Sequence, residues 1–98
     1  MQRTVLPADA LNAVLDDLPH WEVEGDAITR TFTFHDFEGA IAFVNRVARV
    51  AERMNHHPDM DIRYNRVVCT LSTHDAGGVT ELDVRLAREM DGKAEGEK

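Results

Sequence analysis

The chain has 98 residues, of which 43% are hydrophobic and 30% are charged, and its formal net charge at pH 7 is -7. This length and composition predict a single small globular domain over residues 1–98. The negative charge argues against direct nucleic-acid binding, which needs clustered lysine and arginine. The single cysteine, Cys69, forms no internal disulfide, and no apolar run is long enough for a signal peptide or a membrane span. We therefore expect a cytoplasmic protein.

The N-terminal third of the chain predicts one helix and a pair of strands. Leucine and valine at three- and four-residue spacings favour a helix over residues 7–18, with Pro7 at its first position. Alternating apolar and polar residues predict strands over residues 21–24 and 27–34, joined by a turn at Gly25. One face of the second strand carries Ile28, Arg30, Phe32 and Phe34, and the other carries Thr29, Thr31 and Thr33.

A second and longer helix is predicted to begin after Asp36, which is expected to cap it, and to run to about Met54. It must end before Pro58, because proline disfavours the helical conformation of the residue that precedes it. Two apolar lines run along this helix, the first formed by Phe37, Ile41, Val44, Ala48 and Ala51 and the second by Phe43, Val47, Val50 and Met54. Such a wide apolar face is expected to contact the sheet and, in addition, a second surface other than the sheet.

The remainder of the chain predicts two strands and a last helix. The strands are expected over residues 62–64 and 67–73, with a tight turn at Asn65-Arg66 between them. The last helix is expected over residues 81–91. Thr80 and Asp83 have the spacing of a capping box at its start. The side chains expected to face the core are Leu82, Leu86, Ala87 and Met90, while residues 1–4 and 92–98 are expected to be flexible.

The predicted order of elements is α-β-β-α-β-β-α, without internal repeats. Strand pairs joined by tight turns favour an antiparallel sheet, and the helices must then cover one of its faces. The sequence therefore predicts an α+β fold, with a four-stranded antiparallel sheet and three helices packed on one face.

Three of the five histidines lie at the ends of predicted elements. His56 and His57 follow the long helix, and His74 follows the last strand. Histidine exchanges protons near neutral pH, so a cleft that gathers three imidazoles suits general acid and base catalysis. Glu52 precedes His56 by four residues and is spaced to orient it, and Asp83 is expected to do the same for His74. A carboxylate fixes the tautomer of an imidazole and favours its protonated form.

Simpler interpretations of the same residues remain open at this point. His20 and His35 are expected to be surface residues, and Cys69 a packing residue. Asp83 is explained structurally as a helix cap and Glu52 as a solvated helix residue. A metal site is an alternative for the three histidines, although adjacent histidines match known zinc-ligand spacings poorly.

The chain resembles the pterin-4a-carbinolamine dehydratase family over residues 5–91. The resemblance is strongest in Ala-Glu-Arg-Met-Asn-His-His-Pro-Asp at 51–59, in Tyr-Asn-Arg-Val at 64–67, and in Leu-Ser-Thr-His-Asp at 71–75. It implies the α+β fold predicted above and assembly as a homodimer or homotetramer. It also implies dehydration of 4a-hydroxytetrahydropterin to quinonoid dihydropterin, in tetrahydrobiopterin recycling after aromatic amino acid hydroxylation, with neither a metal nor a cofactor.

The resemblance also implies roles for individual residues. The catalytic residues of the family fall on His56, His57 and His74. His56 and His74 are expected to act as general acids, and His57 to bind the substrate and help accept a ring-nitrogen proton. Glu52 and Asp83 match the supporting carboxylates. Besides the three histidines, the substrate-binding residues implied are Asn55, Pro58, Ser72, Thr73 and Asp75.

One position departs from the family pattern, because Met60 stands where many members have an aromatic residue. At that position the chain therefore lacks an aromatic ring to stack on the substrate, although a methionine side chain can lie against a ring. Two alternative functions remain at this stage: a protein-interaction module of the same fold, and a metal-dependent enzyme that uses the same histidines.

Overall fold

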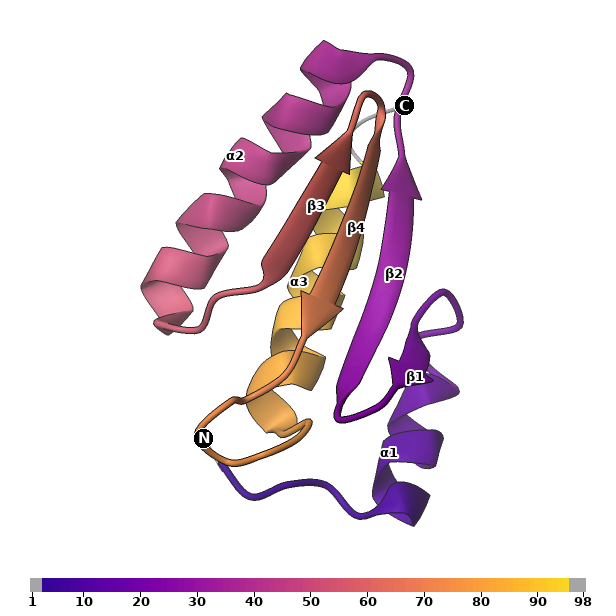
Figure 1. Cartoon of the computed structure of the whole chain (residues 1–98), viewed down its shortest axis with the longest axis vertical. Helices are drawn as coiled ribbons and strands as arrows, with labels where there is room; N and C mark the ends of the chain where they lie inside the picture. The colour runs from indigo at the N-terminus through magenta and orange to yellow at the C-terminus, as the bar shows by residue number, and fades with distance from the viewer. Residues whose placement is uncertain (1–2, 96–98) are drawn as a thin grey trace.

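A four-stranded antiparallel sheet forms the centre of the fold in the computed structural model, which describes residues 3–95 (Figure 1). Along the chain the elements are α1 (Ala8–Leu15), β1 (Glu22–Glu24), β2 (Ala27–Thr33), α2 (Phe37–Met54), β3 (Asp59–Arg63), β4 (Arg66–Leu71) and α3 (Glu81–Glu95). The spatial order of the strands is β1-β2-β4-β3, so the chain crosses over through α2 before β4 returns beside β2. This arrangement confirms the predicted α+β fold and its order of elements.

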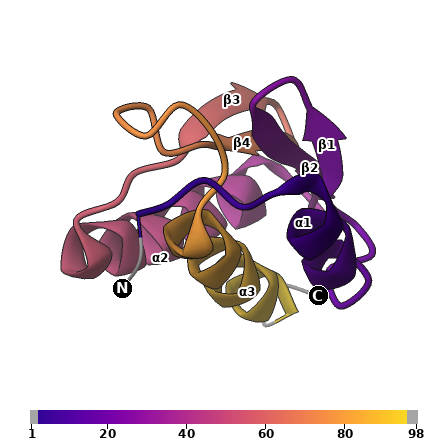
Figure 2. The ribbon, with the colours of Figure 1, turned by 90° about the horizontal axis from the view of Figure 1, so that it is seen from below.

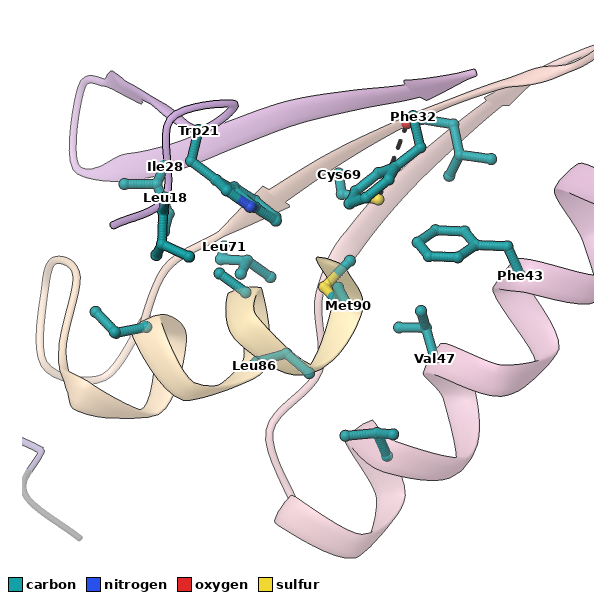
Figure 3. Packing of buried hydrophobic residues seen from close by; sticks show 14 of the residues in the cluster. Leu18, Trp21, Ile28, Phe32, Phe43, Val47, Cys69, Leu71, Leu86 and Met90 are labelled. Atoms are coloured by element: carbon teal, nitrogen blue, oxygen red, sulfur yellow. Dashed lines mark hydrogen bonds between the residues drawn. The ribbon is translucent and has the colours of Figure 1, made fainter. Parts of the chain in front are cut away.

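The three helices lie on one face of the sheet, as Figure 2 shows from below. The inner face is set by the register of the two central strands, in which Ile28 lies opposite Leu71 and Phe32 lies opposite Val67. These side chains are buried and pack with Phe43 of α2 in one hydrophobic core (Figure 3). The alternation predicted for β2 is therefore confirmed.

The long helix faces the core with the second of its two predicted apolar lines. Phe43, Val47 and Val50 are buried, whereas Phe37, at the start of the first line, is 51% exposed. The predicted start and end of α2 are both confirmed. Asp36 Oδ1 accepts a hydrogen bond of 2.9 Å from the backbone N–H of Gly39, as expected of an N-cap.

Several predicted boundaries differ from the structure. The first helix covers Ala8–Leu15, with Pro7 as its N-cap rather than its first residue. It ends three residues before the predicted Leu18, because the N–H groups of Asp17 and Leu18 bond to carbonyls three residues back, in a tighter turn. The predicted turn at Asn65-Arg66 begins one residue earlier, at Tyr64, whose φ is 54°.

The last helix extends four residues beyond its predicted end and runs to Glu95. Tertiary contacts support this extra turn: Arg46 donates a 2.9 Å hydrogen bond to the carbonyl of Lys93, and Ala94 packs against the core. The flexibility predicted for 92–98 is thus wrong for 92–95. Residues 1–2 and 96–98 lie outside the described part of the chain. Leu82, predicted to face the core, is half-buried, and Val84 joins the core in its place.

Between residues 3 and 95, no helix is both long enough and apolar enough to cross a membrane.

Candidate active site

The C-terminus of α2 places the two adjacent histidines in different surroundings. Asn55 adopts the left-handed conformation, with φ 51° and ψ 42°. Its N–H bonds to the carbonyl of Glu52, while the N–H of His56 bonds to the carbonyl of Ala51. This pair of bonds is a Schellman motif, which ends the helix and turns the chain. After the turn His56 is 8% exposed, whereas the side chain of His57 is 55% exposed.

A tight loop after β4 supplies the third histidine. The N–H of Thr73 donates to the carbonyl of Gly78 at 2.9 Å, and the N–H of Gly77 donates back to the carbonyl of Thr73 at 2.9 Å. Gly77 has a φ of +85°, a conformation that favours glycine. The loop closed by these bonds presents His74 and Asp75 as exposed residues at its tip.

The helix end and the loop meet at an open cleft with a volume of about 290 Å³. Its walls are formed by Arg3, Asn55, His56, His57, Ser72, Thr73, His74 and Asp75. The cleft thus brings together the three histidines and four of the other predicted binding residues. Pro58 and Met60 instead line a neighbouring groove of about 220 Å³ between α2 and β3.

A buried hydrogen-bond network holds His56 from below. Its Nε2 lies 2.5 Å from Oδ1 of Asp83, a carboxylate with no exposed surface. The other carboxylate oxygen accepts the hydroxyl of Thr73 at 2.8 Å and the backbone N–H of Thr80 at 2.9 Å. The bond from Thr80 completes the predicted capping box. Asp83 therefore both starts α3 and orients a histidine of the cleft.

The proton directions in this network follow from its partners. The hydroxyls of Thr73 and Thr80 are 2.7 Å apart. Because Thr73 uses its single proton on Asp83, Thr80 must be the donor to Thr73. The hydroxyl of Thr80 also accepts the N–H of Leu82 at 3.2 Å. The chain of donors therefore runs from Leu82 through Thr80 and Thr73 to Asp83.

The predicted pairing of carboxylates with histidines is wrong in both cases. Asp83 pairs with His56 and not with His74. Glu52 pairs with His57, whose Nε2 lies 2.6 Å from Oε2, and not with His56. The helical spacing used in the prediction ceases to apply at Asn55, where the chain turns. His74 lies at the loop tip, with its Nε2 3.9 Å from the carboxylate of Asp59.

The second ring nitrogen of His56 is available to a ligand. Every buried polar side-chain atom in residues 3–94 has a hydrogen-bond partner. The partner of His56 is Asp83, whose Oδ1 contacts Nε2 of the ring. Nδ1 is therefore the nitrogen that retains access to the cleft. A buried carboxylate on one side and an accessible nitrogen on the other is an arrangement suited to proton transfer.

Sequence reasoning missed Arg3, which was predicted to lie in a flexible end. Its guanidinium bonds to the carboxylate of Asp75, 72 residues away along the chain, and lines the cleft. This hydrogen bond lowers the pKa of Asp75 below its ordinary value. No local pattern near Arg3 indicates such a contact, because it depends on how the N-terminus crosses the folded domain.

The remaining residues singled out from the sequence have contacts or positions that explain them structurally. The hydroxyl of Ser72 donates to the backbone carbonyl of Asp26 at 2.9 Å, so Ser72 joins the cleft wall to the first hairpin. Cys69 is buried, and burial raises the pKa of its thiol to about 12, as expected of a packing residue. His20 and His35 are exposed, as predicted. Within residues 3–94, no group of three or more histidine, cysteine or acidic side chains is arranged to hold a metal ion.

The fold and the cleft together define an α+β protein with a cleft lined by three histidines, one of which contacts a buried carboxylate. The model of the family described as pterin 4 alpha carbinolamine dehydratase matches residues 4–93. Because this match covers nearly the whole chain, the chain belongs to that family. The resemblance identified from the sequence is thereby confirmed.

Relatives and a solved structure agree with this assignment. A Thermomicrobium roseum protein is 55% identical over 78 residues, covering 80% of this chain and 84% of the relative. It is named a pterin-4-alpha-carbinolamine dehydratase, which is a lyase. A Nocardia farcinica protein of the same name is 50% identical over 93% of this chain and 96% of its own length. A Brucella melitensis structure described as a transcriptional coactivator/pterin dehydratase superposes with a TM-score of 0.90 at 44% identity, over 93% of this chain and 99% of that one.

A more distant structure shares the fold alone. It is described as a pterin dehydratase-like protein that is a RuBisCO assembly factor in the alpha-carboxysome. Its TM-score is 0.63 at 20% identity, over 76% of this chain and 86% of that one.

Proposed function

We propose that this protein is a dehydratase that converts 4a-hydroxytetrahydropterin to quinonoid dihydropterin and water, in the recycling of tetrahydrobiopterin. The observation that carries the proposal is the buried His56–Asp83 pair, which faces a cleft that also contains His57 and His74. Membership of the dehydratase family names the substrate class. The geometry supports the type of catalysis.

The reaction is an elimination, and its atoms balance without an oxidant or a reductant. An acid gives a proton to the 4a-hydroxyl, the bond between carbon 4a and oxygen breaks, and water leaves. The electrons of the adjacent nitrogen–hydrogen bond form the new carbon–nitrogen double bond, and a base accepts the nitrogen proton. Two proton transfers therefore suffice, and both lie within the chemistry of histidine. The proposal includes neither a metal nor a cofactor.

His56 and His74 are the proposed general acids, and His57 is proposed to bind the substrate and accept the nitrogen proton. The Asp83 carboxylate lies 2.5 Å from Nε2 of His56 and orients the ring, so that Nδ1 is the nitrogen proposed to transfer a proton. Glu52 lies 2.6 Å from Nε2 of His57 and orients that ring at the cleft wall. His74, at the exposed loop tip, lines the same cleft as His56 and His57.

The remaining residues of the cleft wall are proposed to bind the pterin. Asn55, Thr73 and Asp75 offer side-chain or backbone donors and acceptors to a flat, polar ring system. Ser72 contributes through its backbone, since its hydroxyl is already bonded to Asp26. Pro58 supports the site from the neighbouring groove, where it lies beside Met60.

A direct assay tests the proposal. An aromatic amino acid hydroxylase generates the carbinolamine, and its loss is followed with and without the protein, in the presence and absence of a chelator. Acceleration that persists with the chelator is expected. Absence of acceleration by the wild type would contradict the proposal and favour the interaction-module alternative, whereas inhibition by the chelator would favour a metal-dependent enzyme.

Single substitutions test the site. His56→Ala and His74→Ala are each expected to lower kcat by about 100-fold or more, the scale of general acid catalysis. His20→Ala is a matched control, because His20 is an exposed histidine outside the cleft, and it should retain wild-type activity. Full activity in both cleft variants would show that these histidines are not the acids.

A further inference from the structure

The N-terminal segment of the described chain, residues 3–6, is fastened against the loop that carries His74. The N–H of Leu6 donates to the carbonyl of Val79 at 2.8 Å. Val5 lies over Gly78 so closely that a Cβ at Gly78 would be 2.9 Å from Cγ1 of Val5. Figures 1 and 2 show this segment beside the loop before α3. The segment is therefore part of the structure around the cleft.

This attachment places Arg3 at the rim of the cleft. One terminal nitrogen of its guanidinium bonds to Oδ1 of Asp75, and both residues line the cleft. The side chains are 50% and 72% exposed, so the pair stays accessible from the cleft opening. A guanidinium has five N–H donors and this bond uses one of them, so donors remain for a ligand. The carboxylate likewise keeps acceptor capacity.

We propose that Arg3 is a further substrate-binding residue, which acts with Asp75 to recognise the pyrimidinone edge of the pterin ring. This inference rests on the proposed function. That edge presents a carbonyl oxygen beside a ring N–H and an exocyclic amino group. Arg3 donates to the carbonyl, and the Asp75 carboxylate accepts from the two N–H groups. A paired cation and anion thus match an edge that has both acceptor and donor atoms.

The pair is also suited to this task electrostatically. The hydrogen bond from Arg3 holds the pKa of Asp75 below its ordinary value, so the carboxylate is an acceptor throughout the neutral range. An arginine provides a planar set of donors, which lysine does not, so lysine is not expected to replace it.

The test compares Arg3→Gln with Arg63→Gln. Arg63 is a matched control because it is also an exposed arginine paired with an aspartate, Asp61 at 2.9 Å, but it lies outside the cleft lining. Arg3→Gln is expected to raise KM about 10-fold, the scale of one charge-assisted hydrogen bond, with kcat changed by less than about twofold. Arg63→Gln should change neither constant. Unchanged KM in Arg3→Gln, with an unchanged melting temperature, would overturn the inference.

Non-reacting ligands separate this inference from the proposed function. Dissociation constants are measured for an oxidised pterin and for lumazine, in which an oxygen replaces the 2-amino group. Arg3→Gln should weaken both ligands about equally, because both keep the carbonyl, and Asp75→Asn should weaken the pterin more than the lumazine. Wild-type protein that binds pterin without turnover would contradict the dehydratase function alone. Equal pterin affinity of the wild type and Arg3→Gln would contradict the role of Arg3 alone.

Discussion

Thr73 connects the cleft wall to the buried carboxylate that orients His56. Its hydroxyl donates to Asp83 at 2.8 Å and accepts from Thr80, and its side chain is almost completely buried. We propose that Thr73 is a positioning residue, which affects catalysis by holding Asp83 against His56.

Thr73→Val is expected to lower kcat about 10-fold, with a loss of about 1–3 kcal/mol in unfolding free energy, since Asp83 loses one of its hydrogen bonds and the hydroxyl of Thr80 loses its acceptor. Thr73→Ser keeps the hydroxyl and is the matched control. Steady-state kinetics and urea unfolding measure the two effects. In addition, nitrogen NMR of His56 should show the tautomer mixture change in Thr73→Val only. An unaltered kcat in a folded Thr73→Val protein would show that the hydroxyl does not position the site.

The buried thiol of Cys69 is expected to make the unfolding free energy depend on pH in the alkaline range. Burial raises the pKa of its thiol to about 12 in the folded protein, above the value of roughly 8.5 for a free thiol. The unfolded chain therefore loses the thiol proton first as pH rises, and stability falls between these two values. Unfolding free energies of the wild type and Cys69→Ala, measured at several values between about pH 9 and pH 11, should diverge in slope. The wild-type slope is expected to be steeper by about 1.4 kcal/mol per pH unit. Parallel slopes would refute this.

At the scale of residues, the sequence predicted which histidines lie together better than it predicted their hydrogen-bond partners. His56, His57 and His74 line one cleft as their positions suggested. Their carboxylate partners differ from the prediction, because helical spacing stops at Asn55, where the left-handed turn redirects the two histidines. Arg3 was missed because its partner Asp75 is distant in sequence.

Among the elements, α2 matters most for the site because it delivers Asn55, His56 and His57 to the cleft. Its hydrophobic face anchors it beneath the sheet, and its two ends are defined by Asp36 and by the Schellman motif. Both ends were predictable, since capping residues and a following proline act locally. The extension of α3 was not, because Arg46 and the core support its last turn from outside the helix.

Asp36→Ala is expected to lower the unfolding free energy by about 1 kcal/mol, the usual contribution of an N-cap. The activity should remain that of the wild type, because Asp36 lies at the opposite end of α2 from the histidines. Asp36→Ser, which keeps a capping oxygen, is the control and should lose only a fraction of this stability. Denaturant titration measures both variants, and equal stabilities of the alanine and serine variants would contradict the capping role.

For the molecule as a whole, we expect a homodimer or homotetramer. A domain of this length buries a limited core, and the first apolar line of α2 remains partly exposed, as do Val23, Ile62 and Tyr64. Sedimentation equilibrium should give twice or four times the 11.0 kDa mass of the chain. A concentration-independent mass of one chain would contradict the expectation.

The sequence by itself determined the α+β fold, the order of its elements and the histidines that gather at one end of the sheet. It could do so because periodicity, capping and turn chemistry act over a few residues. Only the tertiary structure decided that Asp83 contacts His56, that Glu52 contacts His57 and that Arg3 bonds to Asp75 at the cleft. Those contacts depend on how α2, the loop after β4, the start of α3 and the N-terminal segment pack together. Such packing is a property of the whole core, which no local pattern encodes.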